Sequence, residues 1–222
     1  MNVEDMIKRI LINTAILFIF MLPCLIWYRQ TGDISIYFTD EVPEGQLLYI
    51  LSKLMGMYAL LCIALQMIVS LIENPRILGV KWQAIPHRVF GGLVIIMAIS
   101  HLLLFFFAVS LRQGSMAWGL LMPDFHDFYH THITLGLFGF WILLAILVSG
   151  VARILFANSK ISLLHNAYWV SIVFVYLHAL SIGTDIQSSL GLLLYGALGV
   201  VILVLFINRL AKMNRTRMAC AE

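Results

Sequence analysis

Charged residues are scarce in this chain of 222 residues. Asp, Glu, Lys and Arg make up 11% of the sequence, against about 25% in ordinary soluble domains. Hydrophobic residues make up 62%, and the mean hydropathy is +0.97. This composition excludes a soluble globular protein. The net charge of +3 is too small to support binding to nucleic acid, so no nucleic-acid partner is expected.

The chain also lacks paired cysteines and nucleotide-binding motifs. Its three cysteines, Cys24, Cys62 and Cys220, are far apart, and there is no C-x-x-C or C-x-x-C-H motif. Zinc ribbons, thioredoxin-type chemistry and covalently attached haem c are therefore unsupported. No Walker loop or glycine-rich dinucleotide fingerprint is present, so the sequence predicts no nucleotide site and no separate catalytic domain.

Long apolar runs fill most of the sequence. Each is close to the 20 or so apolar residues that a membrane-spanning helix needs. The six predicted spans are residues 10–28, 46–72, 85–111, 132–152, 163–183 and 189–208. The first run is too long for a signal-peptide core, and we expect it to be retained. We predict an all-α integral membrane protein: a six-transmembrane-helix bundle in a single domain, residues 1–222.

The basic residues are distributed unevenly between the two sides of these spans. Eleven of the 14 lysines and arginines fall on the side of the two termini. The other side keeps Arg29, Lys53 and Arg112, together with acidic loops that include Asp124, Asp127 and Asp185. By the positive-inside rule both termini are cytoplasmic, and we expect a multi-pass protein of the cell (inner) membrane.

Four of the seven histidines lie within predicted spans. His87 and His101 are fourteen residues apart in the third span, about 21 Å along a helix and only about 40° around it. His165 and His178 are thirteen apart in the fifth span, which runs in the same direction. His87 therefore lies level with His165, and His101 level with His178.

Two levels of facing imidazoles in apolar helices are what two bis-histidine b-type haems require. We predict two haem b groups, with irons ligated by His87 with His165 and by His101 with His178. Gly91, four residues after His87, lies on its face and would admit the macrocycle close to the backbone. Arg88 either pairs a haem propionate or only marks the cytoplasmic side.

The competing interpretation is that these histidines are structural groups bonded across helices. Pairing in depth on two helices favours haem ligation instead. The thirteen-residue spacing turns His165 and His178 about 140° apart around an ideal helix. We therefore expect a local distortion of that helix between them.

Three further histidines, His126, His130 and His132, stand in the external segment MPDFHDFYHTH. With Asp124 and Asp127 they form a ligand set for a metal ion or a ferric chelate. The alternative is that they only solvate a loop at the membrane surface.

These motifs resemble the ferric reductase-like transmembrane domain of NADPH oxidases and ferric-chelate reductases, over nearly the whole chain. PHRVFGG is similar to that family's opening of the third helix, and LLHNAYWVSIVFVYLH to its fifth-helix ligand segment. HITLGLFGFWILLAILVSG is similar to its fourth span. The stand-alone haem-binding subunit of the bacterial methionine-sulfoxide reductase system has nearly this length, but lacks a histidine at the position matching His87.

The resemblance implies a b-type cytochrome that is the membrane subunit of an oxidoreductase. Such a subunit passes electrons from a cytoplasmic donor to an external acceptor such as a ferric chelate. Oxidase-type relatives continue into a flavin- and NADPH-binding domain. This chain stops at Glu222, so a separate flavin/NAD(P)H reductase or a quinol is expected as the donor. No catalytic residue is assigned to the chain itself.

Two alternatives remain. One is a haem-binding subunit that delivers electrons to a periplasmic reductase of the methionine-sulfoxide type. The other is a histidine-lined metal or proton transporter, since intramembrane ionisable groups mark such paths. A transporter is expected to place carboxylates beside its histidines, and no Asp or Glu lies well inside any predicted span.

Overall fold

The computed structural model describes residues 3–39, 41–72, 80–156 and 167–219, and within that part every regular element is helical. The elements are α1 (Val3–Thr31), η1 (Ile34–Phe38), α2 (Gln46–Leu71), α3 (Val80–Gln113), η2 (Trp118–Leu121), α4 (Phe128–Phe156), α6 (Tyr168–Ile182) and α7 (Ser189–Ala219). The predicted all-α class is confirmed.

Five of these helices are long and apolar enough to cross a membrane. Their apolar stretches are Thr14–Thr31, Gln46–Leu71, Val89–Gln113, Phe128–Ala152 and Ser189–Lys212, which overlap five of the six predicted spans. The predicted fifth span, residues 163–183, contains α6, a shorter apolar helix of 15 residues. Its first part falls in residues 157–166, outside the described residues. The chain therefore has the character of a multi-pass membrane protein.

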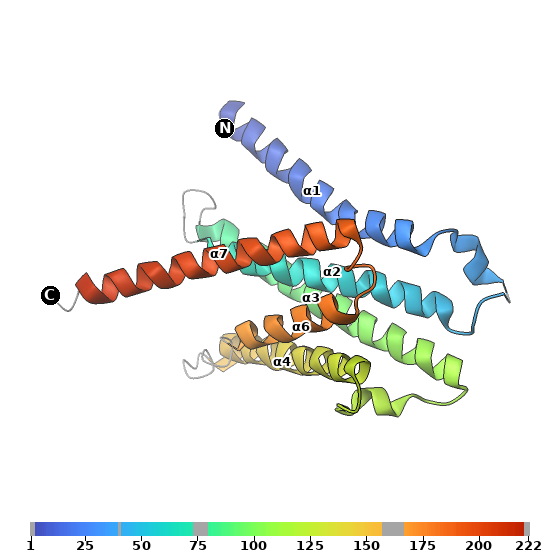
Figure 1. Cartoon of the computed structure of the whole chain (residues 1–222). Coiled ribbons are helices and arrows are strands. Elements are labelled where there is room, and N and C mark those ends of the chain that lie inside the picture. The colour runs from blue at the N-terminus through green and yellow to red at the C-terminus, as the bar shows by residue number, and fades with distance from the viewer. Residues whose placement is uncertain (1–2, 40, 73–79, 157–166, 220–222) are drawn as a thin grey trace.

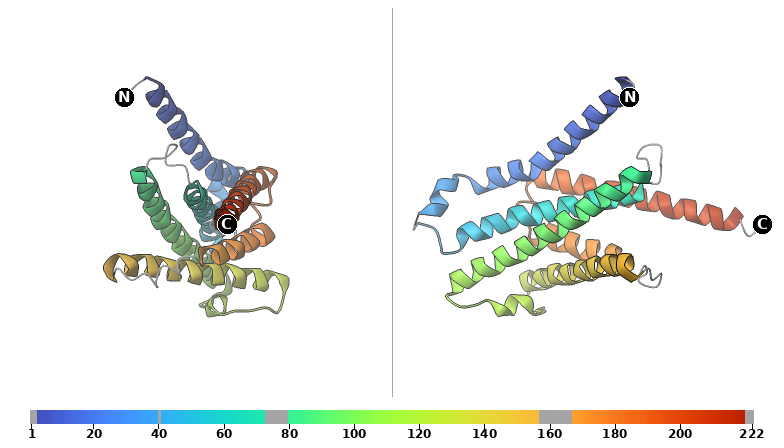
Figure 2. Two further views of the ribbon diagram at one scale, coloured as in Figure 1. Left: turned by 90° about the vertical axis from the view of Figure 1, so that its left-hand side faces the viewer. Right: turned by 180° about the vertical axis from the view of Figure 1, so that it is seen from behind.

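The helices make their most extensive contacts in two pairs. α2 runs along α3, and α4 runs along α6; α2 also contacts α7 and α1. α1 begins and α7 ends toward the same end of the bundle, on the left of Figure 1, whereas η1 and η2 lie toward the other end. In the end-on view of Figure 2, α4 lies across the bottom of the bundle.

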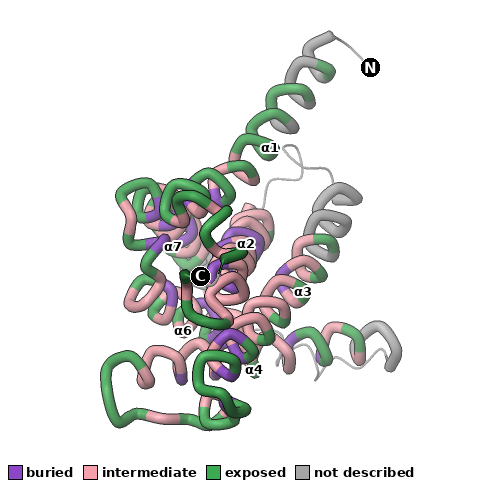
Figure 3. The backbone as a smooth tube through the Cα atoms, turned by 90° about the vertical axis from the view of Figure 1, so that its right-hand side faces the viewer, coloured by how far each residue is buried: buried purple, intermediate pink, exposed green. Residues whose placement is uncertain are grey.

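The core follows α2. Leu60, Leu61, Cys62 and Ala64 are almost completely buried there, and Tyr195 of α7 packs into the same cluster. Figure 3 shows buried positions gathered around α2 and a largely exposed α1. Because lipid is as apolar as these side chains, exposed Leu and Ile on the outer helix faces are expected in a membrane bundle.

A close approach of backbones joins α2 to α3 where α2 begins. Gly45 precedes α2 with φ 76°, in the left-handed region that favours glycine. A Cβ at this position would collide with the backbone carbonyl of Ala108 in α3. The start of α2 is thus held against the far end of α3, and this fixes the register in which their side chains meet.

Candidate functional site

His101 and His178 meet between the two helix pairs. His101 lies in the middle of α3, and His178 near the end of α6. Their ring centroids are 6.2 Å apart, and the ring planes are inclined by 70°. The structure thus brings together two histidines that are 77 positions apart in the sequence, at the same level of the bundle.

Each ring is fixed by a hydrogen bond to a backbone carbonyl of the neighbouring helix. Nδ1 of His101 donates to the carbonyl oxygen of Ser52 in α2 over 2.7 Å. Nδ1 of His178 donates to the carbonyl oxygen of His132 in α4 over 2.8 Å. A carbonyl only accepts, so Nδ1 carries the hydrogen in both rings. The Nε2 of a neutral imidazole then keeps its lone pair for a ligand.

A glycine stands beside each ring. A Cβ built on Gly136 would lie 2.6 Å from Nδ1 of His178, and one built on Gly56 would lie 3.0 Å from Nδ1 of His101. The first distance is shorter than side chains tolerate, and the second is tight. Glycine at these positions lets each imidazole reach the backbone of the neighbouring helix.

The two hydrogen bonds share one local arrangement. Ser52 and Gly56 are four residues apart in α2, as are His132 and Gly136 in α4. In an α-helix the carbonyl of the first residue also accepts the N–H of the fourth residue after it. Each of the two carbonyls therefore accepts a hydrogen bond within its own helix and a second one from an imidazole. The glycine one turn later leaves room for the imidazole because it has no side chain. Sequence spacing of the histidines alone does not indicate these supporting residues.

The two histidines line a cavity between α2, α3, α4 and α6. It contains about 1370 Å³ of space free of protein atoms, part of which is open to the surroundings. Most of its wall is apolar, including Leu60, Val94 and Phe140. We call this space the His101–His178 cavity.

Charged groups line the cavity at the end of the bundle where η1 and η2 lie. Asp185, in the α6–α7 turn, forms an ion pair with Lys53, and the side chain of Asp185 is only 4% exposed. Its Oδ2 has no hydrogen-bond partner among the described residues. Its position in the sequence predicts an external loop, whereas the structure buries Asp185 at the cavity wall, where Lys53 of α2 compensates its charge.

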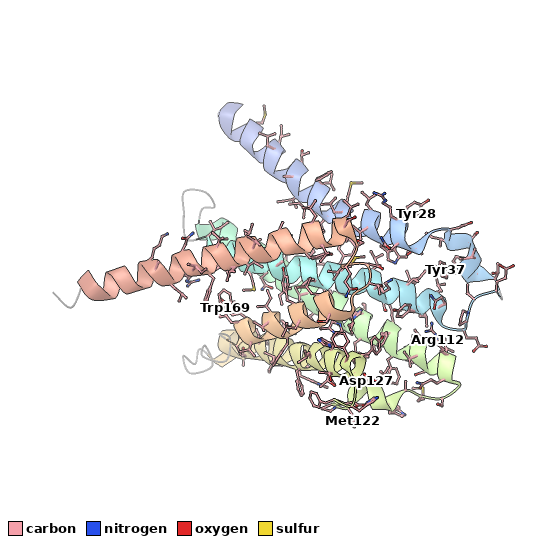
Figure 4. All side chains as sticks on the ribbon, viewed as in Figure 1. Tyr28, Tyr37, Arg112, Met122, Asp127 and Trp169 are labelled. Carbon is pink, nitrogen blue, oxygen red and sulfur yellow. The ribbon has the colours of Figure 1, made fainter. Side chains whose placement is uncertain are left out.

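The three basic residues near the acidic loops, Arg29, Lys53 and Arg112, each have surroundings that favour a cation. Lys53 forms an ion pair with Asp185. The charged group of Arg112 lies 5.6 Å from the ring centre of Tyr49, and Nζ of Lys53 lies 5.8 Å from the same ring centre. Arg112 also stands in the last turn of α3, and Arg29 in the last turn of α1, where a cation is favoured by the helix dipole. Figure 4 shows Arg112 at the same end of the bundle as Asp127, opposite Trp169.

The other predicted ligands are only partly described. His87 and Arg88 belong to α3, but their side chains lie outside the description, and His165 falls in residues 157–166, outside it altogether. The distortion expected between His165 and His178 is absent from the described part, Tyr168–Ile182, which is a regular α-helix. Gly91 faces α2: a Cβ there would lie 3.2 Å from the side-chain nitrogen of Gln66.

The three histidines of the 124–132 segment lie at or just before the start of α4. His126 contacts Asp124 and Asp127, and His130 contacts Asp127. Hydrogen bonding to Asp124 raises the pKa of His126, and the backbone N–H of His126 lowers the pKa of Asp124. A backbone N–H from His130 likewise lowers the pKa of Asp127. His132 differs, because its Nδ1 donates to a backbone carbonyl one turn earlier.

His101 and His178 are the residues that would hold a haem iron. Their ring centroids are 6.2 Å apart, and Nδ1 of each ring is bonded to a carbonyl, so Nε2 of each ring would be the ligand atom. Ligating histidines usually donate their other ring N–H to a carbonyl or carboxylate, as both rings do here. The donor set and its surroundings therefore fit haem b.

Comparisons with known proteins add no identification. No known protein family, curated protein or solved structure matches the chain. Functional assignment consequently depends on the geometry above.

Proposed function

We propose that the chain is the membrane electron-transfer subunit of an oxidoreductase, a di-haem b-type cytochrome. His101 and His178 bind one haem iron, and His87 and His165 bind the second. The observation that carries this proposal is the His101–His178 pair. The two ring centroids are 6.2 Å apart, and Nδ1 of each ring donates its hydrogen to a backbone carbonyl.

The His101–His178 cavity supports the proposal through its division into apolar and polar parts. Haem b is a flat apolar macrocycle with two anionic propionates at one edge. Apolar side chains line most of the cavity, and the Lys53–Asp185 ion pair lies at one end. Because Asp185 already neutralises Lys53, the cation that a propionate directed to that end would meet is Arg112, whose charged group lies 5.6 Å from the ring centre of Tyr49.

The wider architecture follows from the same proposal. The chain crosses the cell (inner) membrane six times with both termini in the cytoplasm, and resembles the ferric reductase-like transmembrane domain. A separate flavin/NAD(P)H reductase or a quinol donates electrons on the cytoplasmic side, and an external acceptor such as a ferric chelate, or a periplasmic reductase, receives them. Bound haem supplies one-electron chemistry, while the chain supplies ligands, orientation and an apolar surrounding.

A transporter of metal ions or protons is the second candidate, because Asp185 supplies the buried carboxylate that the sequence seemed to lack. It lines the same cavity as both histidines, and one of its oxygens has no partner in the described part of the chain. Two features oppose this candidate. Lys53 neutralises the carboxylate, and hydrogen bonds to carbonyls fix both imidazoles in one tautomer.

Absorption spectroscopy separates the two candidates. Full-length protein purified from haem-sufficient cells should show b-type bands on reduction with dithionite, and two haems per chain by the pyridine haemochrome assay. The variant H101A/H178A should retain one haem, and the external control H126A should retain two. Protein without haem in all three forms would refute the cytochrome and leave the transporter.

A further inference from the structure

A cluster of two histidines and two aspartates lies outside the His101–His178 cavity, in the segment that leads into α4. It consists of Asp124, His126, Asp127 and His130, which we call the outer cluster. Potential ligand atoms of Asp124, His126 and His130 all lie within 4.8 Å of one another. The rings of His126 and His130 are adjacent, with centroids 4.2 Å apart.

One carboxylate oxygen joins the two imidazoles. Oδ2 of Asp127 lies 3.0 Å from Nε2 of His126 and 2.9 Å from Nδ1 of His130. Oδ1 of Asp124 lies 2.7 Å from Nδ1 of His126. Asp124, His126 and His130 thus present nitrogen and oxygen donors close to one another, and Asp127 is bonded to both imidazoles. A bound metal ion would replace hydrogen bonds among these groups with metal–ligand bonds of about 2.1 Å.

The base of the outer cluster is held by the core rather than by loop contacts alone. The backbone N–H of Asp124 donates to Oγ1 of Thr134 over 2.8 Å, and that hydroxyl donates back to the carbonyl of Asp124 over 2.8 Å. Thr134 is 1% exposed. This reciprocal pair attaches the segment to the second turn of α4, so the ligand groups on both sides of the α4 N-terminus keep a fixed separation.

The type of donor selects the type of ion. Imidazole with carboxylate suits Zn²⁺, Cu²⁺ and Ni²⁺, whereas Mg²⁺ and Ca²⁺ prefer sets of oxygen donors. His126 and His130 are accessible to solvent, with side chains 58% and 37% exposed. An ion can therefore reach the cluster from the external side without entering the membrane bundle.

From this geometry we infer that the outer cluster binds one divalent first-row transition-metal ion through Asp124, His126 and His130, with Asp127 orienting the two imidazoles. The site is independent of the proposed haem ligands. The bound ion links the 124–127 segment to the first turn of α4, the helix whose His132 carbonyl holds the ring of His178.

Equilibrium dialysis of the full-length, tag-free protein in detergent against Zn²⁺ tests the site. The wild type should bind one Zn²⁺ per chain at this site, and Cu²⁺ should displace it, as the order of stability of divalent complexes predicts. A thousandfold excess of Mg²⁺ should not. H126A/H130A should weaken binding at least tenfold.

Two further variants make the result specific. D124N keeps the Thr134 contacts, which use only the backbone of residue 124, and should weaken Zn²⁺ binding without loosening the segment. H132A is the matched histidine control and should keep wild-type affinity, since its ring is bonded to a backbone carbonyl. Wild-type protein that binds no stoichiometric Zn²⁺, or equal losses in H132A and H126A/H130A, would overturn the inference.

Discussion

Gly136 of α4 lies directly against the imidazole of His178 in α6. A Cβ on Gly136 would be 2.6 Å from Nδ1 and 2.9 Å from Cε1 of that ring, and the ring cannot easily retreat because Nδ1 is bonded to the carbonyl of His132. G136A should therefore displace His178. Overpacking of this kind costs about 1–3 kcal/mol, and we expect occupancy of one haem to fall about tenfold, measured by the haemochrome assay.

The control for this substitution is on the same helix. A Cβ built on Gly150 would meet no atom of a neighbouring element within 4 Å in the described part of the chain, so G150A adds the same methyl group to α4 without such a contact. It should keep both haems. Equal haem loss in G136A and G150A would mean that helix packing in general, and not the position of His178, controls binding.

Gly56 provides a graded comparison. Its Cβ would lie 3.0 Å from Nδ1 of His101, a tight contact that a shift of a few tenths of an ångström relieves. G56A should consequently lower occupancy of the same haem, but less than G136A does. Absorbance titration of haem-depleted G56A and G136A with added haem measures the affinity of each variant and tests this order. A more damaging effect of G56A than of G136A would contradict the geometry.

Of the six predicted spans, five are present as long apolar helices, and His101 lies level with His178 as predicted, because both features follow from local patterns. Apolar runs define the spans, and the spacing and direction of two helices place His101 beside His178. The hydrogen-bond partners of the two imidazoles could not be predicted. Ser52 and His132 accept through their backbone carbonyls, and which carbonyl faces an imidazole depends on which helices are neighbours. The available signals were Gly136 in α4 and the Ser52-x-x-x-Gly56 spacing in α2, since small residues in membrane helices favour close helix approach.

Asp185 shows the same limit from another direction. Its place between two spans predicts exposure to the external solvent. The cation that compensates its buried charge is a lysine 132 positions earlier in the sequence, and no local pattern connects the two. Long-range ion pairs of this type are visible only when the helices are assembled.

The Lys53–Asp185 pair should matter most when only one partner is lost. K53M leaves a carboxylate that is 4% exposed without its cation, and removal of one partner of a buried pair typically costs about 3–5 kcal/mol. We expect a clear drop in the thermal unfolding temperature in detergent. K53M/D185L removes both charges and should recover most of the loss. A double variant as unstable as K53M would show that the pair is not the cause.

Thr134 should stabilise the backbone of the 124–127 segment before α4. T134V removes both hydrogen bonds to the backbone of Asp124, at a cost of about 1–3 kcal/mol for the buried groups left unpaired. Hydrogen–deuterium exchange should become faster in the peptide that contains residue 124. T134S keeps the hydroxyl and should exchange like the wild type. Unchanged exchange in T134V would refute this role.

The central claim is that His101 and His178 ligate the same haem iron. Near-infrared magnetic circular dichroism of the oxidised protein tests it, because the charge-transfer band of a low-spin haem reports its two axial ligands. H101M and H178M should each convert the same haem from bis-histidine to histidine–methionine ligation or empty that one site, and leave the other haem unchanged. Changes in two different haems, or two unaltered bis-histidine haems in both variants, would contradict the account.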